Sequence, residues 1–138
     1  MNILFIGPYR QADAWGSISQ GLIRSMSMIE DVRLTTRPIF LSNNIERRID
    51  PNIFQFEANK EEKYDVLIQH TLPNYMIYSG EFDKVVGFTS FETKGNEQWD
   101  NYLRLLDKLL VYTEVEKEGL SKEIREKTFS IGSAQEVD

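Results

Sequence analysis

The chain has 138 residues, of which 41% are hydrophobic and 28% charged; it contains no cysteine and a single histidine. This composition is typical of a globular protein with one core, and it excludes disulfide frameworks, thiolate or multi-histidine metal sites and cysteine catalysis. The formal net charge is −6, with the acidic excess mainly in the second half. A nucleic-acid-binding surface is not expected, because such surfaces carry clustered lysine and arginine.

The longest apolar runs, such as residues 3–6, have the length of a strand and fall far short of the ~20 apolar residues of a membrane helix. The sequence passes from Met1 directly into a strand pattern, without the basic and apolar regions of a signal peptide. We therefore expect a cytoplasmic protein without a membrane span.

Apolar residues follow strand-like and helix-like spacings in alternation. Residues 3–6 are continuously apolar, as in the centre of a parallel sheet, and apolar side chains in residues 15–29 recur every three or four positions, as on one face of a helix. Further strands are predicted at residues 32–39, 64–69, 85–89, 109–112 and 128–131.

Two later helix starts carry capping residues. Asn96 is placed to cap a helix whose apolar face includes Trp99, Leu103 (or Tyr102) and Leu106. Thr113, followed by Glu116, forms a capping-box pattern that predicts a helix from about Glu114 to Arg125.

Residues 40–63 are mostly polar and interrupted by Pro51. Only Ile53, Phe54 and Phe56 suggest a short strand there, so this region is interpreted as an excursion from the regular fold.

The alternation of strands and helices predicts βαβ units with right-handed crossovers. The expected fold is α/β, a Rossmann-like three-layer sandwich with a mostly parallel central sheet. Residues 1–132 are expected to form one domain and residues 133–138 a tail.

The carboxyl ends of parallel strands meet at one edge of a sheet, which is where ligands bind in open α/β folds. This edge is expected to gather residues 7–10, 70–71, 90–92 and Thr113. His70 has two interpretations. An imidazole, with its ordinary pKa near 6.5, is suited to hydrogen bonding or proton transfer in a site. Alternatively, His70 is simply hydrogen-bonded to backbone at a strand end. Glu92 is interpreted either as a base or hydroxyl-binding carboxylate or as a helix cap.

The loop from Gly7 to Ser17 matches neither GxGxxG nor the GxxxxGK[ST] phosphate loop, so dinucleotide binding is not expected and no cofactor is predicted. Two interpretations of it remain open. In the first, Gly7 forms a turn, Gly16 lets the helix approach the sheet and Trp15 is a core residue. In the second, the backbone N–H groups of the loop face a phosphate or a sugar hydroxyl. Asp13 is either a hydroxyl ligand or a helix cap.

Taken in chain order, several segments resemble the N-terminal domain of GT-B glycosyltransferases of family 4: ILFIGPYRQADAWGSISQGLIRSM, TRPIF, YDVLIQHTLP, VVGFTSFET and W…LRLLDKLLVYTEVEKEGL. The resemblance implies transfer of a sugar from a nucleotide-sugar donor to an acceptor hydroxyl, with retention and without an obligatory metal. It also implies that this chain is the acceptor-side half, inactive without a donor-binding domain.

The resemblance implies acceptor-side catalytic roles for His70 and Glu92. Lys94 departs from the family pattern, which often has an acidic residue at that position. The implied substrate-binding residues are Gly7, Tyr9, Arg10, Trp15, Gly16 and Thr71.

The expected partners are the nucleotide-sugar donor, the acceptor, and a second copy or a separate donor-binding domain. The alternative hypothesis is a stand-alone, non-catalytic α/β binding or interaction module, in which Tyr9, Trp15, Phe91 and Trp99 would be exposed aromatic residues if they face the strand-end edge of the sheet. A receiver-like domain is set aside, because it requires an acidic pair where Gly7-Pro8 stands.

Overall fold

The computed structural model describes residues 1–90 and 96–131. The chain divides into two compact units, Met1–His70 and Thr71–Asp138. Strands alternate with helices along the chain, and the strands paired within each unit run parallel. The predicted α/β fold of Rossmann-like type, with a parallel sheet, is confirmed.

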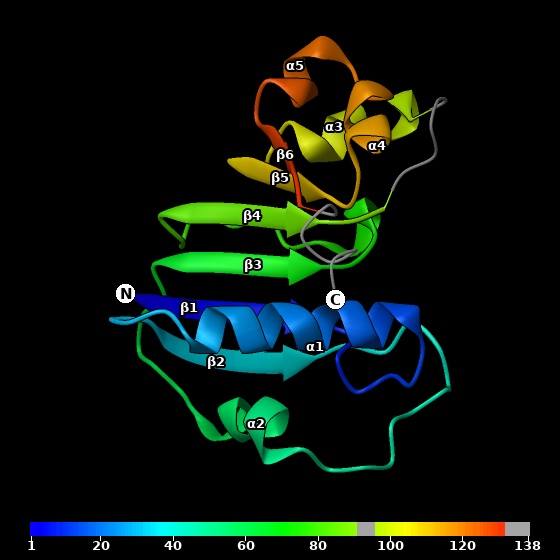
Figure 1. The fold of residues 1–138 in the computed structure, drawn as a ribbon. Coiled ribbons are helices and arrows are strands. Elements are labelled where there is room, and N and C mark those ends of the chain that lie inside the picture. Colours follow the sequence, from blue (N-terminus) through cyan, green and yellow to red (C-terminus); the bar gives the residue numbers. More distant parts are fainter. Residues whose placement is uncertain (91–95, 132–138) are drawn as a thin grey trace. The chain divides into compact units, whose positions relative to one another are not determined.

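In the first unit, β1 (Asn2–Gly7) lies between β2 (Arg33–Pro38) and β3 (Val66–His70). Helix α1 (Ala14–Ser27) connects β1 to β2 and lies alongside these strands (Figure 1). Apolar side chains from the strands and from one face of α1 form the core, because burying this stripe removes it from water. Its buried members are Ile3, Phe5, Tyr9, Ile23, Met26, Leu34 and Ile53.

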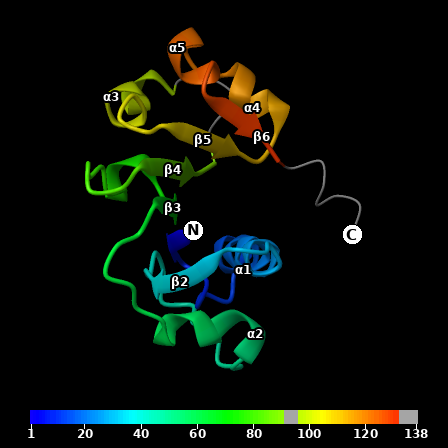
Figure 2. The same cartoon turned by 90° about the vertical axis from the view of Figure 1, so that its left-hand side faces the viewer.

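The excursion after β2 contains helical turns: α2 (Pro51–Phe54) and the 3₁₀ helix η1 (Gln55–Ala58). Seen along the strands, α2 lies beyond β2 (Figure 2). The strand expected around Ile53 and Phe56 was wrong. Asp50 accepts a hydrogen bond from the Asn52 N–H at 2.9 Å, and proline stands at the first helical position, so the local sequence starts a helix instead.

In the second unit, β5 (Lys108–Val111) lies between β4 (Lys84–Phe88) and β6 (Thr128–Ser130). A Cβ atom on Gly87 would lie 2.8 Å from Leu106 and Met76 side-chain atoms, so this strand position requires glycine for close packing. The helices of this unit are short: η2 (Pro73–Tyr75), η3 (Glu97–Trp99), α3 (Asp100–Leu103), α4 (Glu114–Glu118) and α5 (Lys122–Arg125).

Two helix predictions in this unit needed correction. Asn96 makes no side-chain capping bond, and the segment after it begins as η3 before continuing as α3. The capping box of Thr113 and Glu116 is present, but the helix ends at Glu118 and α5 begins after Ser121. Leu120 lies at this interruption and is buried in the core, at 4% exposure. A helix that continued along the surface would not require this burial.

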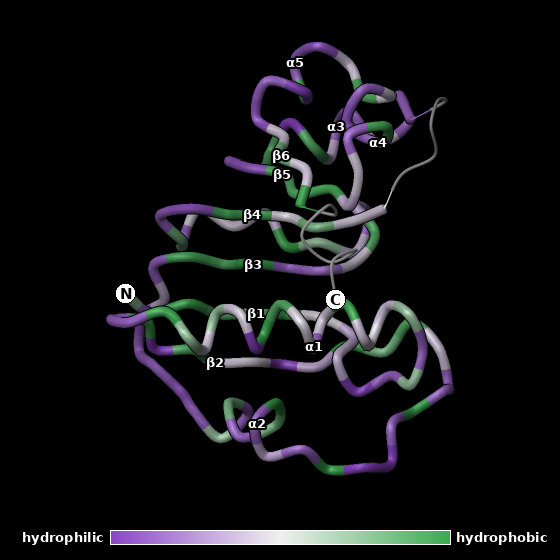
Figure 3. Tube along the Cα trace, in the orientation of Figure 1, coloured by the Kyte–Doolittle hydropathy of each residue, from purple (hydrophilic) through white to green (hydrophobic). Residues whose placement is uncertain are grey.

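Within residues 1–90 and 96–131, no helix has the length and apolar character needed to cross a bilayer. Hydropathy changes along β3, where apolar residues give way to the polar Gln69 and His70 at the carboxyl end (Figure 3). Both polar residues are nonetheless buried, at 1% exposure each. A buried polar strand end of this kind marks the place to look for a functional site.

Candidate functional site

His70, the last residue of β3, lies against two side chains of α1. Its Nδ1 atom is 2.5 Å from the Ser19 Oγ, and its ring stacks on Trp15 with centroids 4.8 Å apart and an interplanar angle of 28°. Trp15 and Ser19 are four residues apart and so share one face of the helix. We call these three residues the Trp15–Ser19–His70 cluster.

Burial lowers the pKa of His70 from 6.5 to about 4, because the charged imidazolium loses its hydration. The imidazole is therefore neutral at pH 7. A neutral ring serves as a hydrogen-bonding group, whereas a group with this pKa is a weak general base near neutrality. The buried position favours a role in positioning over proton abstraction.

Tyr9 and Arg10 converge on one carboxylate, that of Glu57. The Tyr9 hydroxyl donates to Oε1 at 2.5 Å, and Arg10 donates to Oε1 from Nε at 2.7 Å and to Oε2 from Nη2 at 2.5 Å. The Arg10 guanidinium also lies 4.7 Å from the centroid of the Phe54 ring. The hydrogen bond from Arg10 is the main cause that lowers the pKa of Glu57.

Tyr9 has 0% exposure, and its pKa is raised by burial and by the bond to Glu57. This places two of the predicted substrate-binding residues in an internal network. Tyr9 presents no surface to a ligand, and it is not one of the exposed aromatic residues that an interaction module would use. Arg10 is partly exposed but already bidentate on Glu57.

Close packing explains the glycines at positions 7 and 16, two of the predicted substrate-binding residues. A Cβ atom on Gly7 would lie 2.8 Å from the Phe5 ring and 2.9 Å from the Ser19 Oγ. A Cβ atom on Gly16 would lie 1.8 Å from the backbone oxygen of Gln11. Gly16 therefore brings the helix close to its own preceding loop, whereas the sequence suggested a close approach to the sheet.

Asp13 is the N-cap of α1, since its Oδ1 accepts the Gly16 N–H at 3.0 Å. Gln11 is a residue that sequence reasoning missed. It is 1% exposed, and its Nε2 donates to the Asp13 carboxylate at 3.0 Å. Its Oε1 accepts from the backbone N–H groups of Leu41 and of Ser42, the latter at 3.2 Å. The start of the excursion is thereby tied to the loop after β1. A lone glutamine in a polar loop gives no periodic signal that could have identified it.

In the second unit, the hydroxyls of Thr71 and Thr89 are buried and make no hydrogen bond in the part of the chain that the structure describes. The Thr71 N–H donates to the Phe88 oxygen at 3.2 Å, so Thr71 lies beside the carboxyl end of β4. Glu92, the second predicted catalytic residue, lies outside the described residues, as do Phe91 and Lys94. Among the residues that are described, no group of three potential ligands is placed to hold a metal ion.

Comparisons with protein-family models, with curated proteins and with solved structures find no match to this chain. The choice among functions therefore depends on the geometry and chemistry of the residues themselves.

Proposed function

We propose that this chain is the acceptor-side half of a GT-B-like glycosyltransferase, which acts together with a donor-binding domain to move a sugar from a nucleotide-sugar donor to an acceptor hydroxyl. The observation that carries the proposal is the Trp15–Ser19–His70 cluster at the carboxyl end of a parallel strand. A partly exposed indole ring, held in place by the buried imidazole stacked on it, suits a sugar, whose apolar C–H face packs on aromatic rings.

In this proposal, the cluster forms one wall of the acceptor site through the partly exposed Trp15 ring. His70, at 1% exposure, and Ser19 are positioning residues: the imidazole stacks on the indole, and Ser19 fixes the imidazole through Nδ1. Tyr9 and Arg10 act indirectly, by holding the loop in place through Glu57. Glu92 keeps its predicted role as the base or hydroxyl-binding carboxylate.

Isothermal titration against a panel of glycans and nucleotide sugars tests the proposal. We expect weak, roughly millimolar binding of at least one glycan, because half of the site is supplied by another domain. Trp15→Phe should weaken this binding by about fivefold, and Trp99→Phe, in the second unit, should leave it unchanged. Absence of binding to every member of the panel, or equal losses in the two variants, would contradict the proposal.

A specific feature favours the interaction module as a second candidate. Four apolar side chains in or next to η2 and α3, two elements that contact each other, are exposed: Tyr75 at 63%, Ile77 at 46%, Tyr102 at 40% and Leu105 at 61%. Such side chains favour association when they are contiguous. Light scattering over a concentration series tests this candidate, since a strictly monomeric chain would count against it.

A further inference from the structure

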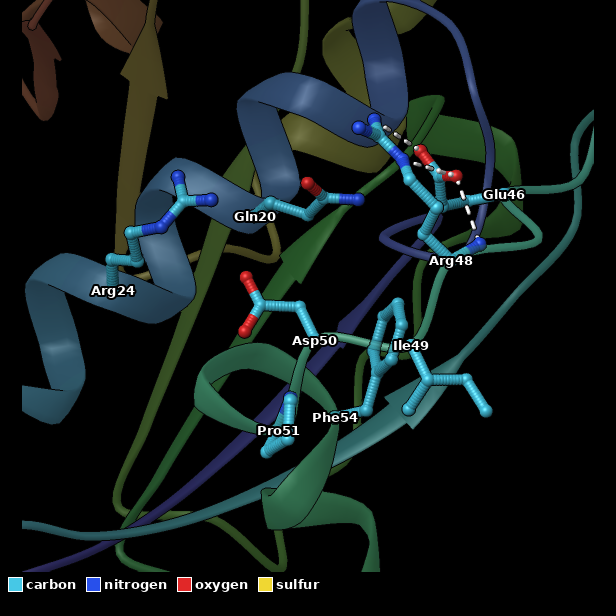
Figure 4. Close-up of a pocket in the computed structure, with 8 residues that line it drawn as sticks. All are labelled: Gln20, Arg24, Glu46, Arg48, Ile49, Asp50, Pro51 and Phe54. Carbon is cyan, nitrogen blue, oxygen red and sulfur yellow. Dashed lines mark hydrogen bonds and ion pairs between the residues drawn. The ribbon is translucent and has the colours of Figure 1, made fainter.

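A pocket of about 380 Å³ lies between α1 and residues 46–54 of the first unit (Figure 4). Its lining combines side chains of α1 with those of the excursion and of α2. The volume is in the lower part of the range for small-molecule sites, so it fits a single compact ligand. No residue predicted from the sequence to be functional lines it.

The pocket is separate from the Trp15–Ser19–His70 cluster because the two use different faces of α1. Gln20 and Arg24, four residues apart, share the face that lines the pocket. Arg24 lies nine residues beyond Trp15, which at ~100° per residue places it on the opposite side of the helix.

The charges in the pocket are balanced. Arg48 and Glu46 neutralise each other, with Arg48 Nε 3.2 Å from Glu46 Oε1 and Nη2 3.3 Å from Oε2. The Arg24 guanidinium makes no hydrogen bond or ion pair with the residues that the structure describes, and the one side-chain hydrogen bond at this residue is from the Ser27 hydroxyl to its backbone oxygen, at 2.8 Å. The Asp50 carboxylate, directed toward α1 in Figure 4, accepts one bond, from the Asn52 N–H at 2.9 Å.

Gln20 is fixed by a bond from its Nε2 to the Tyr9 oxygen at 2.9 Å, so its Oε1 remains an acceptor in the pocket. The pocket therefore offers a guanidinium donor, a carboxylate acceptor and an amide acceptor, with Phe54 as an apolar wall. An anion would be repelled by Asp50, and a cation by Arg24. Vicinal hydroxyls satisfy both groups, since each hydroxyl donates and accepts.

We propose that this pocket is a sugar-binding site that takes one uncharged sugar residue. The hydroxyls would donate to Asp50 and to the Gln20 Oε1 and accept from Arg24, and a C–H face would pack on Phe54. This site goes beyond the proposed function, because it lies on another face of α1 from the acceptor wall. It requires no transfer reaction.

The test is a two-dimensional NMR titration of the full chain with the methyl glycosides of glucose, galactose, mannose and N-acetylglucosamine. We expect at least one glycoside to shift the Gln20 side-chain amide and the backbone amides of residues 46–54. Arg24→Ala should weaken that binding about tenfold, and Asp50→Asn, which preserves the helix cap, should also weaken it. The matched control is Arg47→Ala, which removes an exposed arginine outside the pocket lining.

The proposal is overturned if none of the four glycosides shifts these signals, if Arg24→Ala and Arg47→Ala weaken binding equally, or if glycine or inorganic phosphate binds there more tightly than every glycoside. The Trp15 indole and His70 ring signals report separately on the acceptor wall. A shift of those signals alone would therefore support the proposed function and reject the pocket as a sugar-binding site. A shift of the pocket signals alone would support the sugar-binding pocket and count against the acceptor wall.

Discussion

Gly16 and Gly21 lie in the same helix but are expected to respond oppositely to alanine. In Gly16→Ala, the new Cβ would stand 1.8 Å from the Gln11 backbone oxygen. A carbon–oxygen contact needs about 3.3 Å, so the helix start or the loop must move by about 1.5 Å. Overpacking of this kind costs ~1–3 kcal/mol, and displacing the Asp13 cap costs ~1 kcal/mol more, against a gain of ~1 kcal/mol from helix propensity.

The expected net loss for Gly16→Ala is about 2 kcal/mol in the free energy of unfolding, measured by urea denaturation followed by circular dichroism. Gly21→Ala is the matched control, because a Cβ there meets nothing within 4 Å. It should stabilise the chain by ~0.5–1 kcal/mol. The reasoning is refuted if Gly16→Ala is as stable as the wild type, or if the two variants change stability in the same direction.

The remaining predictions concern stability. Folding lowers the pKa of His70 from 6.5 to about 4. Between these two pH values the unfolded chain therefore binds more protons than the folded chain. The stability contributed by His70 is present above pH 6.5 and is lost as the pH falls toward 4. Urea denaturation should show a loss of about 2 kcal/mol between pH 7 and pH 5 that His70→Gln removes; an equal loss in that variant would reject the assignment. Tyr9→Phe should cost ~1.5 kcal/mol, since it deletes a bond to a charged carboxylate. In a double-mutant cycle with Glu57→Gln the two losses should not add, and full additivity would show that the network does not act as a unit. Thr113→Ala should cost ~1 kcal/mol through loss of the capping box, whereas Ser121→Ala, at a helix start without a side-chain capping bond, should be nearly neutral. Urea denaturation of the two variants checks this, and equal effects would contradict the capping geometry.

The parallel α/β fold was predictable because buried strands and one-faced helices leave periodic traces in the sequence. Residues 3–6 lie in β1, and the helical pattern predicted for residues 15–29 coincides with α1 as far as Ser27. Ile29, the last residue of that pattern, lies beyond the helix and is 54% exposed. The capping box at Thr113 was predictable for a different reason, since its two residues stand at a fixed local spacing.

Features that depend on contacts between distant residues were not predictable. Gln11 stabilises the fold only because residues 41 and 42, about thirty positions later in the chain, lie against it. Likewise, Tyr9 looked like an accessible loop residue, but its partner Glu57 belongs to the excursion that no periodicity described. The pocket at Arg24 and Asp50 arises from the same excursion.

The most direct test of the acceptor-side proposal uses the fact that the chain has a single histidine, so one imidazole ring gives the only histidine signals in a carbon-edited NMR spectrum. We expect the His70 ring signals and the Trp15 indole signal to shift together, saturably, on addition of the glycan that titrates by calorimetry. The Ser19→Ala variant should weaken this response without abolishing folding. A glycan that binds while both signals stay unchanged would contradict the proposal that the Trp15–Ser19–His70 cluster forms the acceptor wall.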